Sequence, residues 1–128
     1  MLISEKNSSQ AGARAFVPLA AAPFHWFEGG HKKWELRKYG RQYTERHIWP
    51  GKRVELRHGY RSGRSLWGNV TDTYSAPTMS EFFTEVDYKA VIPNAASRDE
   101  ACRIAKQILN IPEGVEVALF GFRVELDK

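Results

Sequence analysis

Strand-like and helix-like segments do not alternate along this chain of 128 residues, and their order limits the folds open to it. Alternating apolar and polar residues predict strands at 16–19, 33–39, 52–58, 65–74 and 115–126. Pro18 would place the first of these at an edge of the sheet or at a bulge. A doubly wound parallel sheet needs a helix after nearly every strand. We therefore predict an α+β fold, a small antiparallel β-barrel of about five strands with appended helices.

The helices are predicted from their start signals. Thr78-x-x-Glu81 is a capping box that opens a helix over 79–86, and Ser97-x-x-Glu100 is another that opens a helix to about Leu109. A shorter helix is expected over 22–28, where two glycines follow. Apolar residues at helical spacing predict the core-facing side of the last helix: Ala101, Ile104, Ala105 and Ile108.

The last predicted strand, 115–126, changes the phase of its alternation. Val117 and Leu119 belong to one register, whereas Phe120 and Phe122 belong to the other. We expect a β-bulge or a strong bend between Leu119 and Phe120, because it would turn both halves toward the core.

Length and composition fit one domain, predicted over 15–128, after a mobile N-terminal tail over 1–14. The single cysteine, Cys102, excludes an intramolecular disulfide and a cysteine-based zinc site. No apolar run is long enough to span a membrane, and no two histidines have the short spacing of metal ligands. We expect a cytoplasmic protein without metal or cofactor, whose oligomeric state the sequence leaves open.

Positive charge is concentrated in one third of the chain. The segment 31–64 has eleven Lys or Arg residues against three Glu, a net charge of +8, whereas the whole chain has +4. Five aromatic residues lie in the same segment: Trp34, Tyr39, Tyr43, Trp49 and Tyr60. Basic side chains interleaved with aromatic rings are typical of proteins that bind single-stranded nucleic acid. A solvated charged face with a few core aromatics would have the same composition.

A motif within this segment brings acidic and basic side chains together. Residues 30–37 read G-x-K-x-x-E-x-R, from Gly30 through Lys32 and Glu35 to Arg37. In a strand Glu35 and Arg37 lie on one face, where an ion pair could fix the guanidinium for an anion. Tyr39 continues that face and is the expected platform for stacking a base. The alternative without a binding role is a solvent-exposed ion pair between Glu35 and Arg37, which would contribute little to stability.

This motif and the order of elements around it resemble the ASCH family (activating signal cointegrator homology domains), whose barrel is similar to that of PUA domains. The resemblance covers about 16–126. It implies a PUA-like barrel and a cleft between barrel and helices, lined by the motif residues and suited to RNA or a nucleotide-like ligand.

The resemblance also implies enzymatic alternatives, since some members resemble nucleases and a small branch are amidohydrolases acting on acylated cytidines. That branch uses a lysine at the third motif position, a threonine at the sixth, and a glutamate at the start of the later helical region. This chain keeps Lys32 but has Glu35 at the sixth position and Asn94 near the expected glutamate, with Asp99 or Glu100 as displaced candidates. An amidohydrolase is therefore disfavoured.

The leading hypothesis is a domain that binds single-stranded RNA or a nucleotide-like ligand in a basic cleft. Its predicted binding residues are Gly30, Lys32, Glu35, Arg37, Tyr39, Arg46, Arg61 and Arg64. The first alternative is a ribonuclease, with Lys32, Glu35 and Tyr43 as candidate catalytic residues, although no acid–base pair is evident. The second is a protein-interaction module whose basic surface meets an acidic partner.

Overall fold

The computed structural model describes residues 13–60 and 63–128. Its elements, in chain order, are β1 (Ala15–Leu19), α2 (Ala21–Glu28), β2 (Trp34–Lys38), β3 (Arg53–His58), β4 (Ser65–Ala76), α3 (Met79–Glu85), the 3-10 helix η1 (Tyr88–Ala90), α4 (Arg98–Ile108) and β5 (Leu119–Leu126). Within the described ranges, no helix combines the length and apolar character needed to cross a membrane.

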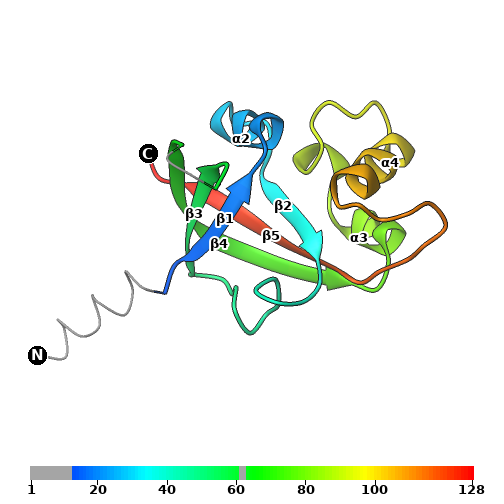
Figure 1. Cartoon of the computed structure of the whole chain (residues 1–128), viewed down its shortest axis with the longest axis horizontal. Coiled ribbons are helices and arrows are strands. Elements are labelled where there is room, and N and C mark those ends of the chain that lie inside the picture. Colours follow the sequence, from blue (N-terminus) through cyan, green and yellow to red (C-terminus); the bar gives the residue numbers. More distant parts are fainter. Residues whose placement is uncertain (1–12, 61–62) are drawn as a thin grey trace, which may run out of the picture.

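All five strands form one curled sheet in the order β1-β3-β4-β5-β2, a half-barrel with β1 and β2 at its edges (Figure 1). The predicted α+β class and number of strands are confirmed. Three neighbouring pairs are antiparallel, but β1 pairs with β3 in parallel, which the sequence analysis did not predict. The parallel pair arises because the chain passes through α2 and β2 before it returns beside β1.

Two hydrophobic cores lie on opposite faces of β5. Phe120 and Phe122 belong to the core inside the curl of the sheet, together with residues of β1, α2 and β3. Leu119 belongs to the second core, which α3 and α4 cover. Because both faces of the strand are buried, apolar residues occupy consecutive positions, and the change of phase is explained without a bulge there. The one register shift between β4 and β5 lies at Val70/Asp72.

Two further predictions are corrected at the helical end of the molecule. The last strand begins at Leu119, and the segment 115–118 is not a strand. In α4, Ala101 and Ala105 are buried in the second core and Ile104 packs against it as predicted, whereas Ile108 is 50% exposed. Two alanines let the helix lie close to the second core, to which Ile108 does not belong.

Gly121→Ala is expected to lower the free energy of unfolding by about 1–3 kcal/mol, because it overpacks the core. A Cβ atom at Gly121 would overlap the ring of Phe82, which α3 holds fully buried. Urea denaturation measures the loss, and adding Phe82→Leu should restore part of it. Unchanged stability of the single variant would contradict this close packing.

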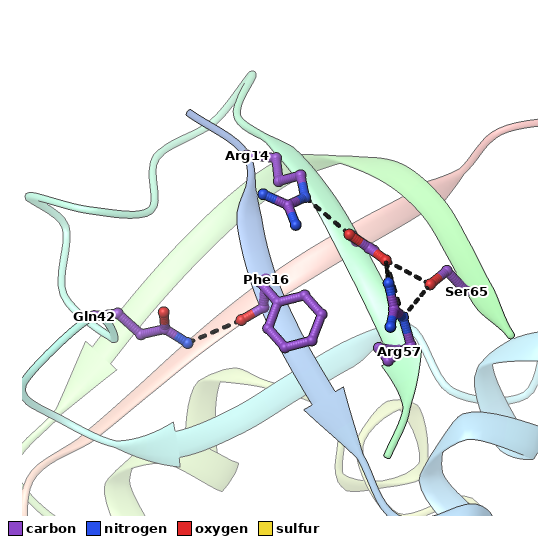
Figure 2. A network of polar contacts seen from close by, with 6 residues as sticks. Arg14, Phe16, Gln42, Arg57 and Ser65 are labelled. Carbon is purple, nitrogen blue, oxygen red and sulfur yellow. Dashed lines mark hydrogen bonds and ion pairs between the residues drawn. The ribbon is translucent and has the colours of Figure 1, made fainter. Parts of the chain in front are cut away.

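A buried carboxylate fixes β1 to its neighbour. Glu55 of β3 is 3% exposed, and it accepts hydrogen bonds from Arg14 (2.8 Å), Ser65 (2.6 Å) and Arg57 (2.6 Å). The Arg14 and Arg57 guanidinium groups also lie 5.7 and 5.4 Å from the centre of the Phe16 ring. Figure 2 shows Arg14 and Arg57 approaching this carboxylate from different sides. The network holds the parallel edge strand in place, although residues 1–12 of the predicted tail lie outside the described residues.

The free edge of β1 is covered by side chains. The carbonyl oxygens of Phe16 and Pro18 point to the same side of the strand, because they lie two residues apart. Gln42 Nε2 donates to the first at 3.1 Å (Figure 2), and Arg37 Nη2 donates to the second at 2.7 Å. These two contacts join β1 to the β2 side of the half-barrel where no backbone ladder does.

Candidate functional site

A cavity of about 250 Å³ lies where the end of β1 and the start of β2 meet α2 and α4. In Figure 1 the start of β2 lies beside α2, and α3 and α4 lie on the other side of β2. The apolar part of the lining includes Leu19, Trp26, Val91, Ile92 and Ile108, and the polar part is Lys32, Glu35 and Arg37. Three residues of the sequence motif therefore lie together in the wall of one cavity.

Lys32 enters this wall from the turn between α2 and β2. Gly30 has a φ of +82°, a left-handed conformation that favours glycine. The Lys32 Nζ donates to the Val91 carbonyl oxygen at 2.6 Å and lies 3.4 Å from Glu35 Oε1. Lys32 is 4% exposed, and this burial lowers its pKa. Glu35 is the carboxylate that balances its charge.

Arg37 occupies the gap between the two edge strands. Its Nε donates to Glu35 Oε2 at 2.6 Å, its Nη1 to the Tyr43 hydroxyl at 2.8 Å, and its Nη2 to Pro18 as above. Burial alone would lower the pKa of Arg37, but the ion pair with Glu35 outweighs burial and the pKa is raised. The guanidinium therefore stays charged. The predicted ion pair on one strand face is confirmed as a partly buried contact.

The polar wall has an excess of one positive charge, since Lys32 and Arg37 share the single carboxylate of Glu35. N–H donors and carboxylate oxygens lie side by side there, as recognition of a base edge requires. The rest of the cavity wall is apolar and includes Trp26. The arrangement can accommodate a small planar ligand with hydrogen-bonding edges or a negative charge.

No family model matches the chain, and no curated protein matches its sequence. Solved structures do resemble it. Hypothetical protein PH0355 covers 89% of this chain and 99% of its own length at a TM-score of 0.71 and 18% identity. Protein PF0455 from Pyrococcus furiosus covers 88% of this chain and 96% of its own length, at a TM-score of 0.60 and 17% identity. ASCH from Zymomonas mobilis covers 88% of this chain and 67% of its own length, at a TM-score of 0.55 and 12% identity.

This chain has the ASCH fold. The match extends over both the half-barrel and the helices. The resemblance inferred from residues 30–37 and the order of elements therefore predicted the fold correctly. In this ASCH fold, β2 provides the motif strand, and the third, sixth and eighth motif residues line the cavity.

Two other predicted residues lie outside the cavity of this ASCH fold. Gly30 shapes the turn before β2 and borders a separate hollow beside Lys33 and Arg123. The Tyr39 hydroxyl donates to Glu45 at 2.6 Å, and the ring packs against Phe120. The Tyr39 ring follows β2 by one residue, so strand alternation no longer determines its direction.

The other predicted residues that the structure describes do not line this cavity. Tyr43 lies beside Arg37, with its ring stacked on Phe122 at 6.3 Å between centroids. Arg46 is exposed in the loop before β3. Arg64 pairs with Glu28 of α2, which lowers the pKa of that carboxyl to about 2. Arg61 lies outside the described residues.

Much of the positive charge predicted for segment 31–64 is paired within the domain. Arg37 contacts Glu35, Arg57 contacts Glu55, Arg64 contacts Glu28, and Arg53 contacts Asp127 with both of its Nη atoms at 2.9 Å. Glu28 at the end of α2 and Asp127 after β5 belong to the acidic remainder of the sequence, which the fold brings beside the basic segment. The net charge of the segment therefore overstates its positive potential.

Sequence reasoning missed Trp26 and the part played by Val91. Phe24 and Phe27 of α2 are three residues apart and fully buried, which leaves Trp26 on another side of the helix, toward the cavity. That spacing is a usable signal. Val91 contributes its backbone oxygen to Lys32, and a backbone group has no side-chain pattern that could indicate it.

The candidate catalytic groups are engaged within the protein. Lys32 contacts Val91, while Glu35 and Tyr43 both contact Arg37. Burial raises the pKa of Tyr43, so its hydroxyl keeps its proton at neutral pH. Among the described residues, no serine, threonine or cysteine lines the cavity, and no group of three metal-ligating side chains occurs.

Proposed function

We propose that this chain binds single-stranded RNA or a free nucleotide by taking one nucleotide unit into the cavity between β1, β2, α2 and α4. The main support is the juxtaposition of the buried Lys32–Glu35–Arg37 group with an apolar wall that includes Trp26. Burying ionic groups costs free energy even when they are paired. These three groups are paired with one another and line an open cavity, where a ligand can reach them. Lys32 and Arg37 would donate to the ligand, Glu35 would accept from a base N–H group, and Trp26 would contact the base plane.

The size of the cavity favours a ligand of one nucleotide. Its volume of about 250 Å³ lies below the range of roughly 300–1,000 Å³ typical for drug-sized ligands. The pairing of Arg53, Arg57 and Arg64 with carboxylates also argues against a long phosphate track across the basic segment. We therefore expect a weak salt dependence, with a log–log slope of roughly −0.7 to −1.4 for one or two phosphate contacts.

Arg37→Ala is expected to weaken binding of 5′-mononucleotides and short single-stranded RNA by about 1–3 kcal/mol, since it removes a charge-assisted donor. The change corresponds to a dissociation constant roughly 5- to 150-fold higher and is measured by calorimetric titration at two salt concentrations. Arg64→Ala is the matched control, because Arg64 belongs to the same basic segment but pairs with Glu28 outside the cavity. Equal losses in the two variants would mean that the cavity is not the site.

Glu35→Gln separates a binding domain from a ribonuclease at the same site. The substitution keeps the shape and removes one negative charge near the ligand, so binding should be retained or improved. A ribonuclease that used Glu35 as a base would lose about a hundredfold or more in turnover. Circular dichroism establishes that Arg37→Ala and Glu35→Gln are folded. Cleavage by the wild type that disappears in Glu35→Gln would replace the binding proposal with the enzymatic one.

A further inference from the structure

A second hollow, of about 410 Å³, lies on the other side of Arg37. Its lining includes Phe16, Arg37, Arg41, Gln42, Tyr43 and Tyr60. Arg37 lines both hollows, because its side chain crosses the gap between β1 and β2 to the Pro18 carbonyl. The two hollows are therefore neighbours along the open side of the half-barrel, with Arg37 in the lining of both.

Two residues that line the second hollow are fixed by contacts, and a third is exposed to solvent. Gln42 holds the loop after β2 against β1 through the Phe16 carbonyl. Tyr43 is stacked on the fully buried Phe122, with an angle of 9° between the rings. Tyr60, in contrast, is 80% exposed. An exposed aromatic ring beside fixed partners is a platform on which a base can stack.

The charge of the second hollow differs from that of the first. Arg37 and Arg41 contribute positive charge, and no carboxylate occurs among the lining residues that the structure describes. Arg41 has a φ of +54°, an uncommon conformation for a residue other than glycine. This hollow therefore suits a negatively charged group better than the first cavity, where Glu35 lines the wall.

Arg37 has donors to spare for a ligand between the two hollows. A guanidinium has five N–H groups, and Glu35, Tyr43 and Pro18 accept three of them. Described residues accept neither of the other two, which belong to Nη1 and Nη2. A phosphate bridging two nucleotides could accept them in a bidentate contact.

We infer that the second hollow is a subsite for the adjacent nucleotide of the same strand, with its base against Tyr60 and the linking phosphate at Arg37. The inference rests on the proposed function and narrows its ligand to a single-stranded oligonucleotide of at least two units. Arg41 contributes positive charge beside that phosphate, and the first cavity receives the neighbouring base.

The test compares the affinity of the protein for mononucleotides with its affinity for dinucleotides. Titrations use the four 5′-mononucleotides and the four homodinucleotides with a 5′-phosphate, pApA to pUpU. Wild-type protein should bind the best dinucleotide at least about 10-fold more tightly than its mononucleotide. Tyr60→Ala should remove roughly 5- to 100-fold of dinucleotide affinity while changing mononucleotide affinity less than about twofold, and Tyr60→Phe should retain the gain. Trp49→Ala is the matched control, because Trp49 is 45% exposed and lines neither hollow.

The possible failures can be told apart. If mononucleotides bind but dinucleotides bind no more tightly, or if Tyr60→Ala leaves the gain intact, the second subsite is wrong and the proposed function stands. An equal loss of both ligands in Tyr60→Ala also overturns the subsite. If neither ligand binds to the wild type, the proposed function is wrong, and the second subsite falls with it.

Discussion

Glu35→Ala is expected to lower the free energy of unfolding by about 3–5 kcal/mol, the range for breaking a buried ion pair by removing one partner. Lys32 is 4% exposed, and the only carboxylate within ion-pair distance of its Nζ among the described residues is Glu35, at 3.4 Å. Without Glu35, Lys32 would have to remain charged in an apolar surrounding or lose its proton. Urea denaturation at pH 7 measures the loss.

A double variant separates charge imbalance from lost packing. Lys32→Met combined with Glu35→Leu replaces both buried ionic groups with apolar side chains of similar length. We expect it to recover part of the stability lost in Glu35→Ala, because the buried charge of Lys32 is removed together with its partner, whereas Arg37 still loses its carboxylate. A loss below about 1 kcal/mol in the single variant would show that Lys32 does not depend on Glu35.

Stability should also decrease in acid because of Glu55. Burial alone would raise its pKa, but hydrogen bonds from Ser65, Arg14 and Arg57 outweigh burial and lower the pKa from 4.5 to about 2. A carboxyl whose pKa is lowered in the folded state stabilises the fold above its unfolded pKa and loses that contribution as the pH falls. The Glu55 contribution, roughly 3 kcal/mol at 1.36 kcal/mol per pKa unit, should therefore disappear between about pH 4.5 and pH 2.

The measurement is the free energy of unfolding from urea titrations between pH 7 and pH 2. Glu55→Gln should be less stable than the wild type at pH 7, and the difference should become small near pH 2. The matched control is Glu116→Gln, since Glu116 is 54% exposed on its side chain and its nearest cation, Lys106, lies 3.7 Å away. A difference between Glu55→Gln and wild type that stayed constant with pH would contradict a lowered pKa.

Strand and helix positions were largely predictable, because their signals are local. The capping side chains of Thr78 and Ser97 accept hydrogen bonds from the backbone N–H groups of Glu81 and Glu100, as the two capping boxes indicated. The strands predicted at 52–58 and 65–74 correspond to β3 and β4 within two residues at each end. Alternation was misleading where a strand has a core on both faces, as in β5, because apolar residues then follow one another.

The candidate site was predictable in part. Strand alternation was enough to bring Glu35 and Arg37 to one face, and their contact at 2.6 Å agrees with it. The sequence did not indicate that Lys32 is buried against the Val91 carbonyl, 59 positions away. Nor did it show which arginines of the basic segment have carboxylate partners, since Glu28 and Asp127 lie far from Arg64 and Arg53 in the sequence.

Local chemistry therefore accounts for the α+β class, the element order and the motif strand, since caps, turns and alternation act over a few residues. Long-range packing accounts for the parallel β1–β3 pair, the two cores around β5 and the open side between β1 and β2. That open side decides where a ligand could bind, because the side chain of Arg37 crosses it and leaves a hollow on each side. Such an arrangement depends on how distant segments approach one another, and no short stretch of sequence specifies it.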